Sequence, residues 1–246
     1  MRKRHGFTLI ELLVVIAIIS LLTSILMPSL NNAKELAKRS VCASNLHHIS
    51  LAVHTYAAEE SDWLPPYSIH SVSINWDVWA SYMAYMGNLF TPTGDIEPAN
   101  LGFVYDAGLI TAPAMLTCPS LDSKNAEGWT HHAYPEPWGT IIPEGSNTIR
   151  VSYNYNPHKA ATDAEQKRYQ RLSSYPADEA MALDVLHDWY LVAHDSAPGW
   201  NLMFADGHAG LKKSQYVYDE VSKGEWPCPG NDWVKFDHLR QTLEEQ

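Results

Sequence analysis

A group of histidine and aspartate residues crowds into the carboxy-terminal half of this sequence. Its members are Asp184, His187, Asp188, His194, Asp195, Asp206 and His208. Imidazole combined with carboxylate is a ligand set for zinc, iron or manganese, whereas carboxylate and carbonyl oxygens suit calcium. The same side chains could instead hold strands and turns together through hydrogen bonds. We therefore carry His194, Asp195, Asp206 and His208 forward as candidate metal ligands.

A second chemically unusual residue is Glu11, which is the single charged side chain in the apolar stretch 7–27. As a helix this stretch would span about 30 Å, the thickness of the hydrocarbon core of a membrane. A carboxylate inside a membrane costs about 2.5–3.5 kcal/mol on insertion scales, so it usually marks a function. Three basic residues precede the stretch and predict a cytoplasmic amino terminus. The run is too long for a cleaved secretory signal, whose apolar region has about 7–15 residues, and a plain anchor would leave Glu11 unexplained.

The residues Gly6-Phe7-Thr8-Leu9-Ile10-Glu11 lie between the basic leader and the apolar run. This arrangement resembles the processing signal of type IV pilins and type II secretion pseudopilins. The resemblance implies that a prepilin peptidase cuts between Gly6 and Phe7 and that the new Phe7 amine is methylated. The apolar helix then stays attached, first in the membrane and later in the core of a filament. Glu11 is expected to pair with the Phe7 amine of a neighbouring subunit, because an unpaired buried charge is costly.

The helical pattern continues beyond the apolar stretch. Apolar and small residues recur at three- and four-residue steps as far as Tyr56, which predicts a helix ending at 59–62, before Pro65-Pro66. Pro28 lies inside this pattern and predicts a kink. The predicted organisation is a leader at 1–6, a transmembrane or filament-core helix at 7–27, a soluble helical half at 28–62 and an α+β body at 63–246.

The body should supply an antiparallel sheet for the long helix. Alternating or apolar runs predict strands at 148–156 and 179–186, and a hairpin formed by 189–194 and the segment from residue 200. Residues 76–87 look like a short helix, and residues 233–243 have the spacing of an amphipathic helix. The expected fold class is α+β and pilin-like, with two layers: a long helix packed on a small antiparallel sheet.

The three cysteines, Cys42, Cys118 and Cys228, show no CxxC spacing. Residues 101–120 resemble a recurrent segment of a pilin-like branch that leads into Cys-Pro-Ser, and this resemblance implies a Cys42–Cys118 disulfide. A Cys118–Cys228 pair remains the alternative. Residues 194–208 resemble the carboxy-terminal signature of the same branch, in which the strand and the Asp-Gly-His turn are structural. Some pseudopilins hold calcium in a late acidic loop, so calcium is the candidate cofactor.

The net charge of −11 argues against nucleic acid as a partner, because an acidic body repels the phosphate backbone. The resemblance implies a structural, non-enzymatic subunit of a type IV pilus-like or type II secretion pseudopilus filament. Its expected partners are prepilin peptidase, other pilin-like subunits and an inner-membrane assembly platform. It would be a single-pass protein of the bacterial cytoplasmic membrane, with its body in the periplasm or an extracellular filament. The alternative is a membrane-tethered, metal-dependent hydrolase or carbohydrate-binding module.

Overall fold

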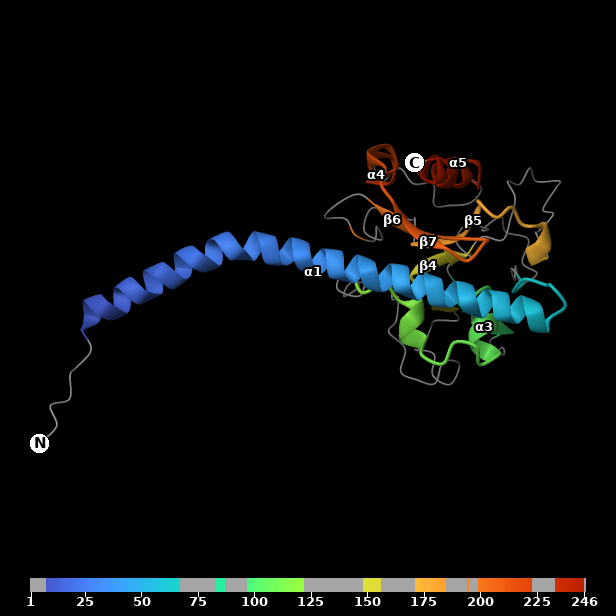
Figure 1. Cartoon of the computed structure of the whole chain (residues 1–246), viewed down its shortest axis with the longest axis horizontal. Coiled ribbons are helices and arrows are strands. Elements are labelled where there is room, and N and C mark those ends of the chain that lie inside the picture. The colour runs from blue at the N-terminus through green and yellow to red at the C-terminus, as the bar shows by residue number, and fades with distance from the viewer. Residues whose placement is uncertain are drawn as a thin grey trace, which may run out of the picture. The chain divides into compact units, whose positions relative to one another are not determined.

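The computed structural model describes residues 8–66, 83–86, 97–121, 148–155, 171–184, 194, 199–222 and 233–245. The chain divides into two compact units, Met1–Ala37 and Lys38–Gln246. Figure 1 shows the elements, which begin with the long helix α1 (Leu9–Glu59). The remaining helices and strands all belong to the second unit.

Helix α1 runs without interruption through Pro28 and ends at Glu59, as the spacing of apolar residues predicted. Ser61 and Asp62 follow it with positive φ angles of 55° and 75°, which end the right-handed helix. The amide of Asp62 donates to the carbonyl of Ala57, and the Asp62 carboxylate accepts hydrogen bonds from Ser173. The end of the helix is therefore held by both backbone and side-chain contacts.

A four-stranded antiparallel sheet forms the centre of the body. Its strand order is β4 (Tyr153–Tyr155), β5 (Ala180–Asp184), β6 (Trp200–Phe204) and β7 (Ala209–Lys212). Residues of α1 such as Leu46 and Val53 belong to the same buried cluster as Met203 on one face. Trp200 and Leu202 belong to a second cluster on the other face with residues of α4 (Gln215–Ser222) and α5 (Trp233–Glu244). The alternation of side chains along a strand produces these two faces.

The domain thus has three layers where the sequence predicted two. Figure 1 shows α4 and α5 on the side of the sheet opposite α1. The predicted carboxy-terminal helix is present as α5, and Leu239 and Leu243 are its buried residues in the second cluster. The two-layer prediction was wrong because both faces of the sheet are apolar and each needs a cover.

The predicted strand 148–156 is split between two sheets. β3 (Thr148–Arg150) pairs with β1 (Met83–Met86), which also pairs with β2 (Glu97–Pro98), while β4 pairs with β5. The strand breaks at Ser152, whose amide donates to the Leu116 carbonyl instead of to a neighbouring strand. Met83–Met86 is a strand, so the helix predicted for 76–87 was wrong there, and residues 76–82 lie outside the described residues.

The predicted hairpin between 189–194 and β6 was also wrong. β6 has β5 on one edge and β7 on the other, so neither edge is open to a further strand. Residues 189–193 lie outside the described residues. The predicted turn at Asp206-Gly207 is present between β6 and β7, where Gly207 has a φ of 95° that suits glycine.

Two short helices lead the chain towards Cys118. α3 (Gly102–Asp106) follows β2, and the 3-10 helix η1 (Pro113–Leu116) precedes Cys118. Gly102 lies so close to β1 that a Cβ atom would come within 1.7 Å of the Ala84 carbonyl oxygen. Only glycine lets α3 approach the strand at this distance.

A buried ion network joins α5 to the sheet. The Arg240 guanidinium contacts Glu179 at 3.2 Å and forms a shorter hydrogen bond with Glu244. Glu244 also accepts the backbone N–H of Ala180 at 2.8 Å, at the start of β5. Burial is the main cause that raises the pKa of Glu244, and the Arg240 charge opposes the rise.

Candidate functional site

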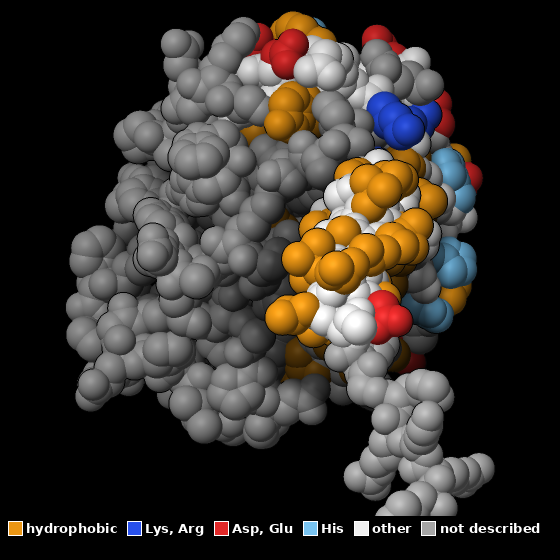
Figure 2. All heavy atoms as spheres, turned by 90° about the vertical axis from the view of Figure 1, so that its left-hand side faces the viewer, with side chains coloured by type: hydrophobic (Ala, Val, Ile, Leu, Met, Phe, Trp, Pro, Cys, Tyr) orange, Lys and Arg blue, Asp and Glu red, His pale blue; other side chains and the backbone are white. Residues whose placement is uncertain are grey.

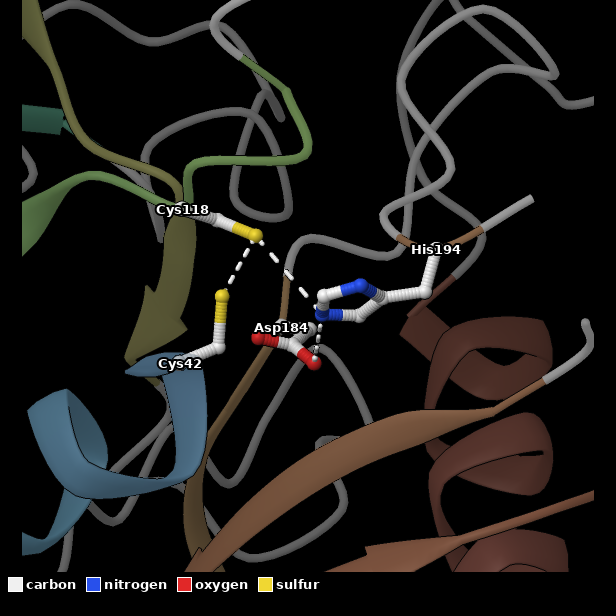
Figure 3. Close-up of side chains that lie close together, drawn as sticks. All are labelled: Cys42, Cys118, Asp184 and His194. Carbon is white, nitrogen blue, oxygen red and sulfur yellow. Dashed lines mark hydrogen bonds and ion pairs between the residues drawn. The ribbon is translucent and has the colours of Figure 1, made fainter. Parts of the chain in front are cut away.

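Four ligand-type side chains meet inside the second unit. One ligand atom from each of Cys42, Cys118, Asp184 and His194 lies within 4.8 Å of the other three. Figure 3 shows the four side chains pointing towards one another. All four are buried, with at most 1% of any residue exposed. We call these residues the four-residue cluster.

Each member of the cluster comes from a different segment. Cys42 lies on the buried face of α1, and Cys118 follows η1 in a Cys-Pro-Ser sequence. Asp184 is the last residue of β5. His194 has a φ of 60°, in the left-handed region, and lies between β5 and β6 in the chain. The two sulfurs therefore come from the amino-terminal half, and the carboxylate and imidazole from the carboxy-terminal half.

The separations between the ligand atoms are short. The Sγ atoms of Cys42 and Cys118 are 2.6 Å apart, and both residues are thiols. Nε2 of His194 lies 3.7 Å from Cys118 Sγ and 3.6 Å from Oδ2 of Asp184. The predicted Cys42–Cys118 disulfide stays a prediction, although the structure places its two sulfurs in contact.

Further polar groups surround the cluster. Nδ1 of His194 lies 3.0 Å from the Ser120 hydroxyl. Oδ2 of Asp184 accepts hydrogen bonds from the backbone N–H and the side-chain amide of Asn201, at 2.7 and 2.8 Å. Oδ1 of Asp184 makes no hydrogen bond to any residue that the structure describes. One buried carboxylate oxygen is thus left available.

The electrostatics of the site follow from burial and close contact. The hydrogen bond from the Cys42 thiol, helped by His194 and the Ser120 amide, lowers the pKa of the Cys118 thiol to about 5 in spite of burial. The Cys42 thiol donates that hydrogen bond and is buried, so its pKa rises well above the ordinary value. Burial, with a smaller contribution from the Cys118 sulfur, raises the pKa of Asp184 to about 7.

One buried cation lies beside the cluster. Nη2 of Arg39, one turn before Cys42 on α1, donates to the backbone carbonyl of His194 at 3.2 Å. Arg39 itself is 6% exposed. Arg39 was not among the candidate site residues from the sequence, and Asp184 belonged to the histidine and aspartate group but was not carried forward as a metal ligand. For Asp184 the available signal was a carboxylate that ends an apolar strand.

Of the metal ligands predicted from the sequence, His194 belongs to the four-residue cluster, whereas Asp206 and His208 do not. Asp206 and His208 are about half exposed and form a hydrogen bond with each other at 2.5 Å in the β6–β7 turn. Asp195 lies outside the described residues. These turn residues face solvent because the hairpin ends there, whereas His194 is buried. The calcium prediction is not tested and stays a prediction.

Two histidines of α1 have packing roles in the second unit. His54 contacts the Ala205 carbonyl through Nε2 at 3.0 Å, and His47 contacts the Gly207 carbonyl through Nδ1 at 3.3 Å. Both contacts hold the β6–β7 turn against the helix. His47 and His54 therefore position the turn that carries Gly207.

The amino-terminal end of α1 begins with a capping box. Oε2 of Glu11 accepts hydrogen bonds from the backbone N–H and the hydroxyl of Thr8, both at 2.8 Å, and Thr8 Oγ1 in turn accepts the Glu11 N–H at 3.3 Å. Oε1 is not engaged by any of the residues that the structure describes. Gly6 and Phe7 lie outside the described residues.

The surface of the same helical segment is apolar. Within the described residues α1 is the one helix long and apolar enough to cross a membrane. Most of its large hydrophobic side chains up to Leu36 are exposed, for example Leu9 at 83% and Ile25 at 68%. Figure 2 shows hydrophobic side chains over much of the visible surface of the helix.

Comparison with known proteins adds two findings. Residues 1–27 match the family model of the prokaryotic N-terminal methylation motif. The chain is 38% identical over 61 residues to type II secretion system core protein G of Klebsiella pneumoniae. That match covers 25% of this chain and 44% of the relative, so it spans less than half of the relative's length. No solved structure matches.

The motif and the fold agree with each other. The methylation motif covers the amino-terminal segment, and behind it one long helix packs on an antiparallel sheet in an α+β arrangement. The chain therefore combines a prepilin-type methylation motif with a pilin-like α+β arrangement.

Proposed function

We propose that this protein is a structural subunit of a type IV pilus-like or type II secretion pseudopilus filament. Prepilin peptidase cleaves it between Gly6 and Phe7, and α1 carries it into the assembly. The observation that supports this most strongly is the first half of α1, which is exposed, apolar and headed by a single carboxylate. The methylation motif over the same residues supports the processing step.

The exposed helix requires an apolar environment. Burying one leucine or isoleucine side chain contributes about 1.5–3 kcal/mol, and this segment leaves many of them uncovered. A surface of this kind marks a membrane or protein contact. A bacterial inner membrane covers it before assembly, with the amino terminus in the cytoplasm and the body in the periplasm. Neighbouring pilin-like subunits cover it in the filament.

The Glu11 carboxylate has one acceptor oxygen that its own helix does not use. The capping box engages Oε2, and Oε1 is left for another donor. The Phe7 amine of an adjacent subunit is a suitable partner, because it exists only after cleavage and is positively charged. An unpaired buried charge costs about 3–5 kcal/mol, so this contact favours one stagger between subunits over others.

The site chemistry supports a structural role over an enzymatic one. The four-residue cluster is buried, so a substrate in solution cannot reach its thiols or its carboxylate. The exposed Asp206–His208 pair is engaged in its own turn. The hydrolase alternative therefore lacks an accessible metal-ligand set among the described residues.

Two replacements of Glu11 separate its charge from its capping role. Glu11→Gln keeps an oxygen that accepts the Thr8 hydrogen bonds, whereas Glu11→Ala removes both the charge and the cap. We expect both variants to be cleaved and both to assemble at least 100-fold less well, since about 3–5 kcal/mol per contact exceeds two factors of ten. The measurement is the yield of sheared filaments from cells that lack the native gene.

Filament yield tests the pairing role of Glu11, and the mass of the mature protein tests processing. Normal filaments from Glu11→Gln would show that only the helix cap matters and would remove the pairing role. Mass spectrometry of mature protein should find a methylated Phe7 at the amino terminus. An intact Met1 in mature protein would contradict processing.

A further inference from the structure

We propose that Cys42, Cys118, Asp184 and His194 bind one zinc ion as a closed structural site. This goes beyond the filament function and does not depend on it, because all four ligands lie in the second unit of one chain. Two thiolates, one imidazole and one carboxylate form a donor set that suits zinc, which binds four such ligands tetrahedrally. Two sulfur ligands suit calcium poorly, since calcium prefers oxygen.

The geometry is close to that of a zinc tetrahedron. With Zn–S of about 2.3 Å and Zn–N and Zn–O of about 2.0–2.1 Å, the edges of the tetrahedron are about 3.3–3.7 Å. The 3.7 Å between Cys118 Sγ and His194 Nε2 matches such an edge, and the Asp184 carboxylate lies close by, with its Oδ2 3.6 Å from the same nitrogen. The Cys42–Cys118 edge, at 2.6 Å, is shorter and opens by about 1 Å when the ion enters.

The surrounding hydrogen bonds orient the ligands as a zinc site requires. If Nδ1 of His194 carries the proton and donates to the Ser120 hydroxyl, Nε2 presents its lone pair to the centre of the cluster. The Ser120 amide also donates to the Cys118 sulfur. Asn201 engages Oδ2 of Asp184 and leaves Oδ1, which has no other hydrogen bond to a described residue, for the metal.

The charges also fit a divalent cation. Two thiolates and a carboxylate with Zn²⁺ retain one net negative charge, and the buried Arg39 guanidinium donates to the carbonyl of the ligand His194. The ion itself offsets two of the three negative charges. Buried charges are tolerated in this way, when they are paired or coordinate a metal.

A disulfide between the two cysteines explains less of the structure. It would use both sulfurs but would need neither an imidazole nor a carboxylate beside them. It would also leave Asp184 buried with one oxygen that no described residue engages. A zinc ion gives all four side chains a ligand role and ties α1, the loop after η1, β5 and residue 194 to one point.

The test measures zinc in the full-length protein purified in detergent without chelators, in a Cys228→Ser background. We expect one zinc ion per chain by elemental analysis. Co²⁺ in its place should give the visible absorption of a tetrahedral cobalt–thiolate centre. Ser120→Ala keeps all four ligands and should weaken zinc binding about 10–100-fold. Asp184→Asn and His194→Ala should abolish binding of one ion per chain.

The matched control is the exposed turn pair. His208→Ala and Asp206→Asn should retain one zinc per chain and the affinity of the parent protein. Chelation should lower the Tm of the parent, and added zinc should restore it. Peptide mapping that finds a Cys42–Cys118 disulfide and no zinc would overturn the proposal. The proposal would also be overturned if the Ser120→Ala, Asp184→Asn and His194→Ala single variants each kept full zinc affinity. Because three variants are compared, poor folding of one does not prevent this conclusion.

Discussion

Gly102 is the position where one methyl group should damage the fold most clearly. In Gly102→Ala the new Cβ would lie 1.7 Å from the Ala84 carbonyl oxygen and 2.7 Å from its carbon. Both atoms belong to the backbone of β1, so no side-chain rotation can relieve the contact. α3 or β1 must therefore move by about 1.3 Å to reach even 3.0 Å, the shortest separation that Cβ atoms show in practice.

The loss of stability expected for Gly102→Ala has two sources. Forcing an extra carbon into a packed contact costs about 1–3 kcal/mol. The Ala84 carbonyl also accepts the Ala99 N–H at 2.8 Å, and displacing it weakens a hydrogen bond that contributes about 0.5–1.5 kcal/mol. Together they should reduce the free energy of unfolding by about 2–4 kcal/mol. For a domain of this size that corresponds to a Tm lower by about 4–16 °C.

The assay is denaturant and thermal unfolding of the full-length protein in detergent, followed by tryptophan fluorescence. Gly210→Ala in β7 is the matched control, because a Cβ there meets nothing within 4 Å. That substitution should be neutral or should stabilise by about 0.4–1 kcal/mol, through the entropy of the unfolded chain. It therefore measures the general effect of replacing glycine by alanine.

Comparing the two variants tests whether α3 lies as close to β1 as described. Equal unfolding midpoints for Gly102→Ala and Gly210→Ala would refute the close approach of α3 to β1. A crystal structure of Gly102→Ala with both elements unmoved would refute it as well.

Two further substitutions test the two faces of the sheet. Leu46→Ala, on the buried side of α1, should lower the free energy of unfolding by about 2–5 kcal/mol in a thermal unfolding experiment. Leu51 is 52% exposed on the same helix, and Leu51→Ala should lower it by well under half as much. Equal losses would contradict this packing. Arg240→Ala should cost about 3–5 kcal/mol, because it leaves Glu244 partly buried without its cation. Burial already raises the pKa of Glu244 above 4.5 in the folded state. The folded state therefore holds a proton that the unfolded state releases, and stability falls as pH rises through the range in which Glu244 ionises. Removing Arg240 raises that pKa further, so the loss between pH 4 and 7 should be larger in Arg240→Ala than in the parent, and adding Glu244→Gln should abolish the difference.

The elements that depend on local pattern could be predicted from the sequence. The long helix, its end at Glu59, strand β5, the turn at Gly207 and helix α5 all follow from periodicity and turn residues. The split of 148–156 could not be foreseen, since the break at Ser152 depends on a hydrogen bond to Leu116, a residue distant in the sequence. The hairpin with 189–194 failed for a similar reason, because a pattern shows that a segment can be a strand but not which edge is free.

The candidate site was predictable only in part. The resemblance to pilin-like sequences placed Cys42 near Cys118, and composition marked His194 as a possible ligand. Asp206 and His208 of the same histidine and aspartate group were carried forward as its partners, but they are not in the four-residue cluster. The actual carboxylate neighbour, Asp184, reaches His194 because β5 ends beside it. Such a meeting depends on tertiary packing, which no local pattern encodes.

The position of the four-residue cluster along α1 has a mechanical consequence. Arg39 and Cys42 are the first two buried residues of this helix. In a filament under tension, a load that travels along α1 enters the folded body at these residues. A cross-link from Cys42 to three other segments would spread the load in shear across the sheet and keep the helix from peeling off one contact at a time. Single-molecule pulling should therefore show a higher rupture force in the zinc-loaded protein than after chelation.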